Sequence, residues 1–236
     1  MEADGRNGGF RLIVGVHDLA EQPDARGDEL RSWVPFSRAR PLLERAVRNA
    51  LAGGSTVEVT SDDGFRSDYD LLMPWLLERG VRGTFFIATR LLGQAGRLTV
   101  AQLREMAAQG MRIGCHGARH VDWARIGERA FVEDVREGRD ALEQALGLRV
   151  DLAAPPFGSY DGVVVRRLLA AGFREIHTCR GGFSLEREAL KPRNMLKDGN
   201  VEAVLATSLR KPGFREALRC RARRARVLPL LHRAMP

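Results

Sequence analysis

Two short stretches carry side chains that could together hold a metal ion. Asp62 and Asp63 directly follow a strand-like run at 57–60, and His116 and His120 stand four residues apart further along the chain. One carboxylate and two imidazoles are ligands that Zn²⁺ takes readily, and a catalytic zinc usually keeps three protein ligands and one open position. The pattern predicts Asp63, His116 and His120 as the ligands. Asp62 then remains free to act as general base on a metal-bound water.

Neither motif is specific by itself. Asp-Asp-Gly is more often an ordinary turn, and a His-x-x-x-His spacing is a common coincidence. The context favours chemistry, because the motifs follow strand-like runs at 57–60 and 111–115, and sites in α/β folds are built at the carboxyl ends of strands. A third stretch at 154–160 also follows such a run, at 150–153.

These stretches resemble the first three motifs of the polysaccharide deacetylases, the NodB-homology group of carbohydrate esterase family 4. The matching residues are Thr60-Ser61-Asp62-Asp63-Gly64, His116-x-x-x-His120 and Pro155-Pro156-Phe157-Gly158, in the family's order. The resemblance covers residues 10–207. It implies an α/β fold, a distorted (β/α) barrel of about seven strands, with all three motifs at one rim. It also implies hydrolysis of an N-acetyl group, usually on an amino sugar.

Amide hydrolysis also needs a general acid, because the departing nitrogen must be protonated. In most of the family this acid is a His after a late strand, and His232 resembles it in letters only, since it follows a basic stretch. His17, at the end of the apolar run 12–16, is the better match. Some relatives are circularly permuted and carry the acid His near the start, and this chain resembles that type. We therefore predict His17 as the acid.

The chain departs from the family pattern at two positions. The third motif usually begins with an Arg that holds the catalytic Asp, but Ala154 stands here. The family also often has an Asp near the sixth strand that tunes the acid His, and Arg180 stands in that region. Arg119 or Arg180 is a candidate for the missing Arg, and Asp18 for the missing Asp.

Other residues are candidates for contact with a sugar or with solvent. Aromatic faces pack on pyranose rings, although packing in the core or at the rim explains the same residues as well. The predicted substrate-binding residues are Pro156, Phe157, Gly158 and Tyr160. The basic residues at 191–193 and Lys197 are interpreted as solvated surface.

Strand and helix alternate along the chain, which is typical of a parallel sheet or barrel. Thr99 is a good N-cap, Asp68 is another candidate cap, and Pro74 is expected to kink its helix. The expected strands are 10–16, 55–60, 81–87, 111–115, 150–153, 173–178 and 190–196. The expected helices are 41–51, 68–77, 100–109, 128–146, 161–171 and 201–209.

Charge divides the 236-residue chain into two parts. Residues 210–236 hold nine Lys or Arg and one acid, so they carry the chain's entire net charge of +8. We predict a catalytic domain at 1–209 and a basic helix or tail at 210–236, suited to peripheral contact with an anionic membrane. Three irregularly spaced cysteines and the absence of a long apolar run predict a cytoplasmic protein.

The leading hypothesis is a metal-dependent hydrolase that removes an N-acetyl group from a free, nucleotide-linked or lipid-linked amino sugar. Zn²⁺ is the expected ion, although iron, cobalt or nickel would also suit two His and one Asp. An amidase acting on another C–N bond is an alternative. So is a carbohydrate-binding relative without activity, suggested by Ala154 and Arg180. Nucleic-acid binding is disfavoured, because no recognition motif accompanies the basic tail.

Overall fold

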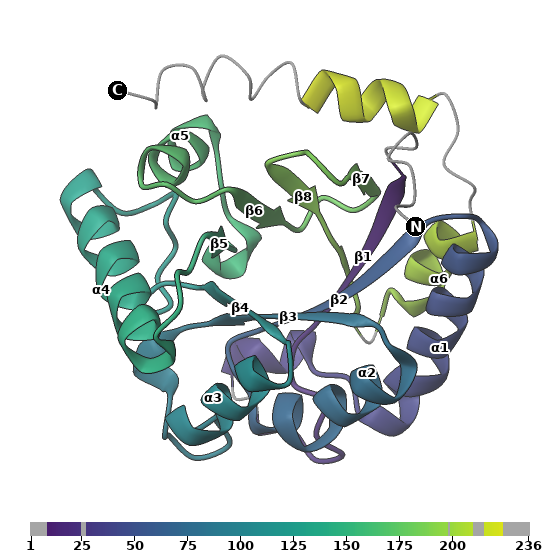
Figure 1. Cartoon of the computed structure of the whole chain (residues 1–236), viewed down its shortest axis with the longest axis horizontal. Coiled ribbons are helices and arrows are strands. Elements are labelled where there is room, and N and C mark those ends of the chain that lie inside the picture. The colour runs from purple at the N-terminus through teal and green to yellow at the C-terminus, as the bar shows by residue number, and fades with distance from the viewer. Residues whose placement is uncertain (1–8, 25–26, 198, 210–214, 224–236) are drawn as a thin grey trace, which may run out of the picture.

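The computed structural model describes residues 9–24, 27–197, 199–209 and 215–223. Within these residues nine strands form one sheet, and the helices α1 to α6 lie around its outside (Figure 1). The strands are β1 (Phe10–Val16), β2 (Thr56–Asp62), β3 (Arg82–Ile87), β4 (Arg112–Cys115), β5 (Leu152–Ala153), β6 (Glu175–Thr178), β7 (Phe183–Leu185), β8 (Leu190–Pro192) and β9 (Asn194–Met195). The α-helices are α1 (Phe36–Ala52), α2 (Met73–Arg79), α3 (Val100–Ala108), α4 (Glu128–Leu146), α5 (Gly162–Ala170) and α6 (Val201–Leu209).

The sheet curls into a nearly closed barrel. Strands β1 to β6 are parallel neighbours in chain order, and β8 continues the sheet beside β6. Immediately after β8, β9 pairs with β1 at the other end of the sheet. The segment 190–195 therefore bridges the two sides, and β7 adds an antiparallel edge to β1. Seven parallel positions result, which confirms the expected distorted barrel of about seven strands.

The two faces of the sheet line two different interiors, one between the sheet and the helices and one inside the barrel. Val59, Phe85 and Ile113 belong to the large apolar core between the sheet and the helices. Their neighbours point the other way, because successive side chains of a strand face opposite sides of the sheet. Phe86, Leu152 and Ala154 form a separate small cluster on that other side. The same side carries buried polar residues, and these build the site described below.

Most predicted elements are confirmed, with differences where local chemistry was misjudged. α4 has the predicted bounds, and Thr99 caps α3 through a capping box with Gln102. Asp68 makes no side-chain cap and begins a π-helical turn, Asp68–Leu72, that leads into α2. Pro74 therefore lies in the first turn of α2, where its missing N–H costs nothing. The expected strand 190–196 is divided into β8 and β9 around Arg193.

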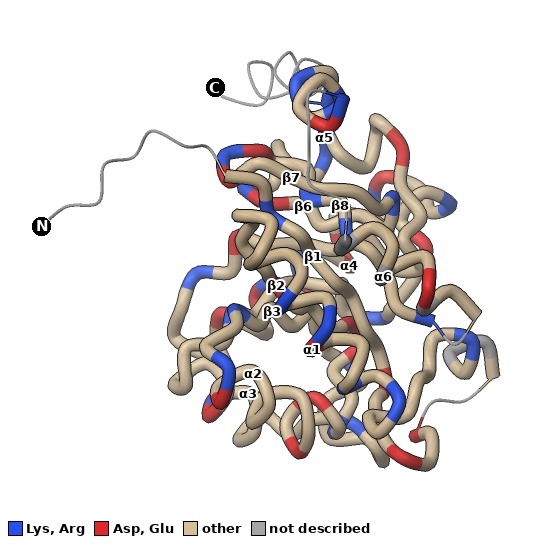
Figure 2. The backbone as a smooth tube through the Cα atoms, turned by 90° about the vertical axis from the view of Figure 1, so that its right-hand side faces the viewer, with Lys and Arg blue, Asp and Glu red and all other residues tan. Residues whose placement is uncertain are grey.

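Part of the basic tail lies against the barrel. Residues 215–223 are helical and sit beside β7, at one end of the molecule (Figures 1 and 2). The Glu216 carboxylate accepts a hydrogen bond from the Phe183 amide at 3.4 Å, and Arg223 donates to the Phe183 carbonyl. The remainder of the predicted tail, 210–214 and 224–236, lies outside the described residues. Among the described helices, none is both long and apolar enough to cross a membrane.

Candidate metal centre

Asp62 and Asp63 stand where β2 ends at the rim of the barrel. Val16 of β1 pairs with Ser61 of β2, so the next residues along, His17 and Asp62, are neighbours. Asp63 has a φ of 74° and Gly64 a φ of 69°, and this left-handed turn ends the strand. Asp tolerates this region better than most residues do. Both carboxylates are buried, with exposed fractions of only 3%.

The two histidines follow β4 and converge on Asp63. Nε2 of His116 lies 3.3 Å from Oδ1 of Asp63, and Nε2 of His120 lies 3.1 Å from the same oxygen. Nδ1 of His116 is 2.6 Å from the Ala154 carbonyl and donates to it. In a neutral imidazole this donation leaves a bare lone pair on Nε2, facing the carboxylate. Two acceptors this close repel each other unless a proton or a metal cation lies between them.

A divalent ion fits this donor set. Among the described residues, Asp63, His116 and His120 form the one trio of such side chains whose ligand atoms all lie within 4.8 Å of one another. Two ligands that are each ~2.1 Å from a tetrahedral zinc are ~3.4 Å apart, close to the distances found here. Oδ1 of Asp63 is also buried without a hydrogen-bond partner. Burial alone would raise the pKa of Asp63, but His116 and His120 hold it well below its usual range.

A buried carboxylate that the sequence analysis did not single out supports the histidine loop. Asp134 of α4 accepts hydrogen bonds from the Arg119 amide at 2.9 Å and from Nε1 of Trp123 at 2.9 Å. A Cβ at Gly117 would lie 2.3 Å from the Asp134 carboxylate. The loop between His116 and His120 is therefore fixed by Asp134, in the way that outer residues commonly orient metal-binding histidines.

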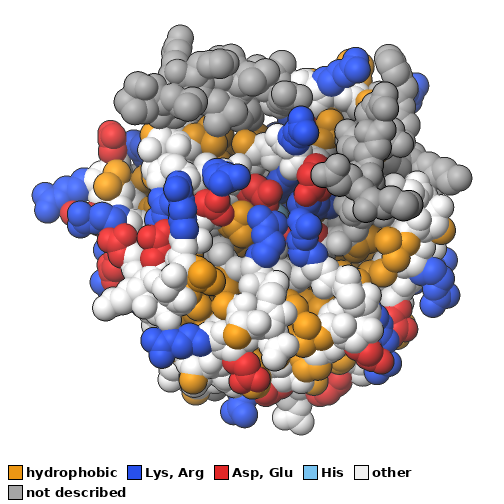
Figure 3. All heavy atoms as spheres, in the orientation of Figure 1, with side chains coloured by type: hydrophobic (Ala, Val, Ile, Leu, Met, Phe, Trp, Pro, Cys, Tyr) orange, Lys and Arg blue, Asp and Glu red, His pale blue; other side chains and the backbone are white. Residues whose placement is uncertain are grey.

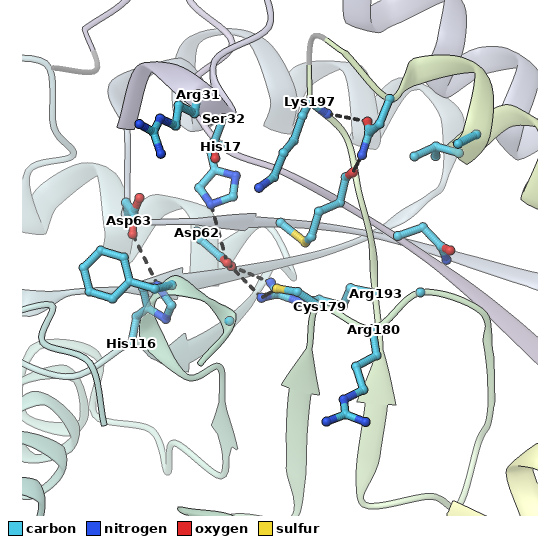
Figure 4. A pocket seen from close by; sticks show the side chains of 18 of the residues that line it. His17, Arg31, Ser32, Asp62, Asp63, His116, Cys179, Arg180, Arg193 and Lys197 are labelled. Atoms are coloured by element: carbon cyan, nitrogen blue, oxygen red, sulfur yellow. Dashed lines mark hydrogen bonds and ion pairs between the residues drawn. The ribbon is translucent and has the colours of Figure 1, made fainter. Parts of the chain in front are cut away.

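Asp62 is held by an arginine that the sequence analysis assigned to solvated surface. Nη1 and Nη2 of Arg193 donate to the two Asp62 oxygens at 2.5 and 2.8 Å, and Arg193 is fully buried (Figure 4). Burial, the largest single influence, would raise the pKa of Asp62, but the charge and hydrogen bonds of Arg193 together with the neighbouring histidines outweigh it and lower the pKa. The surface assignment was wrong for Arg193 and for Lys191, which is also fully buried. Successive side chains of a strand face opposite sides of the sheet, so Lys191 in β8 and Arg193 directly after it both face the barrel interior.

Neither earlier candidate takes this arginine role. Nε of Arg119 lies 3.0 Å from the Asp134 carboxylate and pairs with that residue. The Arg180 guanidinium lies over the Tyr160 ring, 5.2 Å from its centroid. Ala154 instead contributes its carbonyl to His116. Arg193, the residue between β8 and β9, thus holds Asp62 in the way that the family pattern assigns to the Arg of the third motif.

His17 lies beside Asp62 at the rim. Its Nε2 is 3.9 Å from Oδ2 of Asp62, while its Nδ1 is buried without a hydrogen-bond partner. Burial lowers the pKa of His17 more than the charges of Asp62 and Asp63 raise it. Asp18 accepts hydrogen bonds from the Ala20 and Asp24 amides and from Ser67, so it organises its own loop. His232, the other acid candidate, lies outside the described residues.

These groups open into one pocket of about 950 Å³. It is lined by His17, both aspartates and both metal-site histidines, together with Phe157 and Gly158. Phe157 is 66% exposed, and its ring centroid lies 4.5 Å from that of His120. Pro156 is buried and Tyr160 is half-buried, and neither lines this pocket. The structure thus brings two of the four predicted substrate residues to the site.

Backbone strain is concentrated in this pocket. Among the described non-glycine residues, Asp63, His120 and Phe157 are the three with positive φ, at 74°, 54° and 60°. All three line the pocket. Each such conformation costs about 1–3 kcal/mol and persists only where the surroundings enforce it. Two of these residues, Asp63 and His120, are candidate metal ligands.

Solved structures share this fold across most of the chain. IcaB from Ammonifex degensii matches with a TM-score of 0.69 and 22% identity, over 86% of this chain and 98% of that one. The Streptococcus pyogenes deacetylase PplD matches with a TM-score of 0.66 and 19% identity, over 84% and 98%. The barrel and its rim therefore define a NodB-type (β/α) fold.

The sequence comparisons place the chain in a family. The family model for polysaccharide deacetylase matches residues 51–176, more than half of the chain, and the chain belongs to that family. A chitin deacetylase from Pestalotiopsis sp is 28% identical over 146 residues, 59% of this chain and 49% of that protein. YxkH from Bacillus subtilis is 22% identical over 118 residues, 50% and 42%. The chain spans less than half the length of these curated relatives.

Proposed function

We propose that this protein is a metal-dependent hydrolase that removes the N-acetyl group from an amino sugar. The observation that carries the proposal is the meeting of Asp63, His116 and His120 with Asp62 and His17 in one pocket. Family membership supports deacetylation of a carbohydrate. The donor set of one carboxylate and two imidazoles supports Zn²⁺ as the resident ion.

Each residue has a role that its surroundings support. When bound, the ion polarises the acyl carbonyl and lowers the pKa of a coordinated water. Asp62, kept ionised by Arg193, accepts the proton of the attacking water. His17 donates a proton to the departing amine nitrogen, since it reaches the same opening. Phe157 offers an exposed ring beside His120 on which a pyranose can pack.

The decisive experiment combines metal analysis with acetate release. The purified protein is measured for bound metal and assayed on a panel of N-acetyl sugars, before and after chelation and readdition of Zn²⁺. We expect one equivalent of divalent metal and acetate release that returns with the metal. His17→Ala should abolish most turnover and keep the metal, whereas His120→Ala should lose both. Full activity after complete metal removal would overturn the proposal.

We propose a cytoplasmic location and peripheral contact with an anionic membrane through the basic segment. Within 215–223, Glu216 and Cys220 face the barrel, whereas Arg215, Leu218 and Arg221 are exposed. Exposed arginines near an anionic surface contribute ~1 kcal/mol each. Changing Arg215 and Arg221 to Gln should therefore weaken co-sedimentation with anionic vesicles at low salt. The same change at exposed Arg129 and Arg136 of α4 is the matched control, and equal loss in both would contradict the membrane proposal.

A further inference from the structure

The pocket carries more positive charge than its catalytic groups require. Its lining includes the cations Arg31, Arg180, Arg193 and Lys197, but only two carboxylates, Asp62 and Asp63. Arg193 is matched by Asp62, and Asp63 faces the two histidines. The positive charges of Arg180 and Lys197 therefore have no counterpart among the acids that line the pocket. A neutral sugar offers these side chains hydroxyl groups but no negative charge to balance them.

Lys197 and Arg180 are placed to meet a ligand. Both are exposed, and within the described chain no acidic side chain lies within ion-pair distance of either one. Figure 4 shows Lys197 and Arg31 on either side of His17, with the Lys197 side chain extending into the pocket. Arg180 lies further along, where its guanidinium rests on the Tyr160 ring at 5.2 Å. An aromatic platform of this kind orients a guanidinium without neutralising it.

A second pocket continues the path away from the metal centre. It measures about 620 Å³ and shares Arg180, Gly181, Asn194 and Thr207 with the first. Its far side adds Arg219 and Arg223 with one acid, Glu216, from the segment 215–223. Arg180 therefore stands between the two pockets. A ligand that fills the first pocket at the metal centre can extend past Arg180 into the second.

We propose that the substrate is an N-acetyl amino sugar that carries a phosphate or diphosphate group. The acetamido group lies at the metal centre, and the phosphate lies between Lys197 and Arg180, with its carrier directed toward the second pocket. Arg and Lys are the side chains that bind phosphate most strongly, Arg by paired hydrogen bonds and Lys as a point charge. Two or more cations exceed what a single sugar carboxylate would balance. The inference rests on the proposed deacetylase function.

The test compares N-acetyl sugars with and without a phosphate group, and with different carriers on that phosphate. Acetate release is measured for N-acetylglucosamine, its 1-phosphate, its uridine diphosphate ester and a short polyprenyl diphosphate ester, and direct binding of each is measured by calorimetry. We expect the phosphorylated sugars to have the higher kcat/KM and tighter binding, with the advantage falling as salt rises. The nucleotide and polyprenyl arms identify the carrier. A disaccharide of N-acetylglucosamine and glucuronic acid is the carboxylate arm.

Variants assign the preference to residues. Lys197→Ala and Arg180→Ala should each lower the ratio of kcat/KM for phosphorylated over neutral sugar by about fivefold, near the upper end for an exposed ion pair. Lys197→Arg should retain most of the ratio. Arg129→Ala, which removes an exposed arginine from α4, should leave the ratio unchanged and is the matched control.

Three outcomes would overturn the inference. These are equal kcat/KM for neutral and phosphorylated sugars, a stronger preference for the carboxylate arm, or a ratio that survives loss of both cations. The first two leave the deacetylase function standing. Absence of acetate from every sugar would instead reject the proposed function. In that case calorimetry still decides the inference, because equal binding of N-acetylglucosamine and its 1-phosphate contradicts it.

Discussion

The barrel interior holds charged residues at both ends, and the two groups differ in how their charges are satisfied. Near the amino ends of the strands, the Glu58 carboxylate forms ion pairs with Arg11 at 3.1 Å and Arg112 at 3.4 Å. It also accepts a hydrogen bond from the Thr84 hydroxyl at 2.5 Å. Arg112 also reaches Glu175 at 2.9 Å. We call this group, completed by His177 and Lys191, the lower network. Every carboxylate in it has cationic partners from the protein.

The metal centre at the carboxyl ends is built from similar residue types but is left incomplete. Asp63 faces two histidines whose mutual arrangement calls for a cation, and strained backbone positions occur around it. Phe86 separates the two groups, with its ring 4.8 Å from His177 and 5.1 Å from the Arg193 guanidinium. Buried charged residues in a barrel are therefore not by themselves evidence of a functional site. The evidence here is a buried carboxylate, Asp63, whose Oδ1 has no hydrogen-bond partner among the described residues.

Removing a metal ligand is the sharpest way to separate the two ends. His116→Ala should remove the bound metal and lower kcat by about a thousandfold or more, beyond the 10–100-fold typical of residues that only support a ligand. The unfolding midpoint of the metal-free protein should change little. Metal analysis, acetate release and a urea titration check this. Loss of cooperative unfolding would show that the metal centre also maintains the fold.

Arg193 tests whether the orientation of Asp62 matters in addition to its charge. Arg193→Lys keeps a cation but cannot make two parallel hydrogen bonds to the carboxylate. We expect kcat to fall about a hundredfold while metal content stays at the wild-type level. Steady-state kinetics and metal analysis measure this. Arg180→Lys is the matched control and should retain kcat on a neutral sugar within a few-fold.

Breaking the lower network should lower stability and leave kcat nearly unchanged. Glu58→Gln leaves Arg11 and Arg112 facing a neutral side chain in the barrel. The expected loss is about 2 kcal/mol of unfolding free energy, less than the 3–5 kcal/mol of an isolated buried pair. Arg11 and Arg112 keep Glu186 and Glu175 as partners, which accounts for the smaller loss. Urea unfolding measures it, and kcat below the transition should be nearly unchanged. A large fall in kcat under conditions where the variant is still folded would contradict the separation of the two ends.

The smallest expected effect is on acid stability. Burial alone would raise the pKa of Glu175, but His177, Arg112 and Lys191 outweigh it and hold the pKa below its usual range. A carboxyl with a lowered folded-state pKa stabilises the protein above its unfolded pKa of ~4.3, and this stabilisation is lost as pH falls. Glu175→Gln should reduce the loss of stability between pH 5 and pH 3 by about 1 kcal/mol. Melting curves between pH 5 and pH 3 measure this. If the variant and the wild type lost stability equally as pH falls, the lower network would not act this way.

The fold could be predicted from the sequence because its signals are local. Alternating strand and helix patterns predicted a parallel sheet or barrel, and the resemblance of the short motifs to the polysaccharide deacetylases implied the barrel, with Asp63, His116 and His120 at one rim. The structure brings these three candidate ligands together. Arg193 was missed because its partner Asp62 is distant in sequence, and a basic stretch resembles solvated surface. A period-two reading would have found it, since Lys191 and Arg193 alternate with apolar or small neighbours as Glu58, Thr60 and Asp62 do. Asp134 gave no such signal, because one acid on a long helix is ordinary.

The segment 190–195 has a consequence for how the protein is made. It both closes the barrel and delivers Arg193 to Asp62, a contact that spans 131 residues of chain. Contacts of such high sequence separation form late, and domains begin to fold from the amino terminus during synthesis. A chain that has emerged only as far as β6 already contains the three candidate metal ligands but not Arg193, the partner of Asp62. Under the proposed function, the metal site would therefore be complete in sequence before Asp62 has the arginine that holds it.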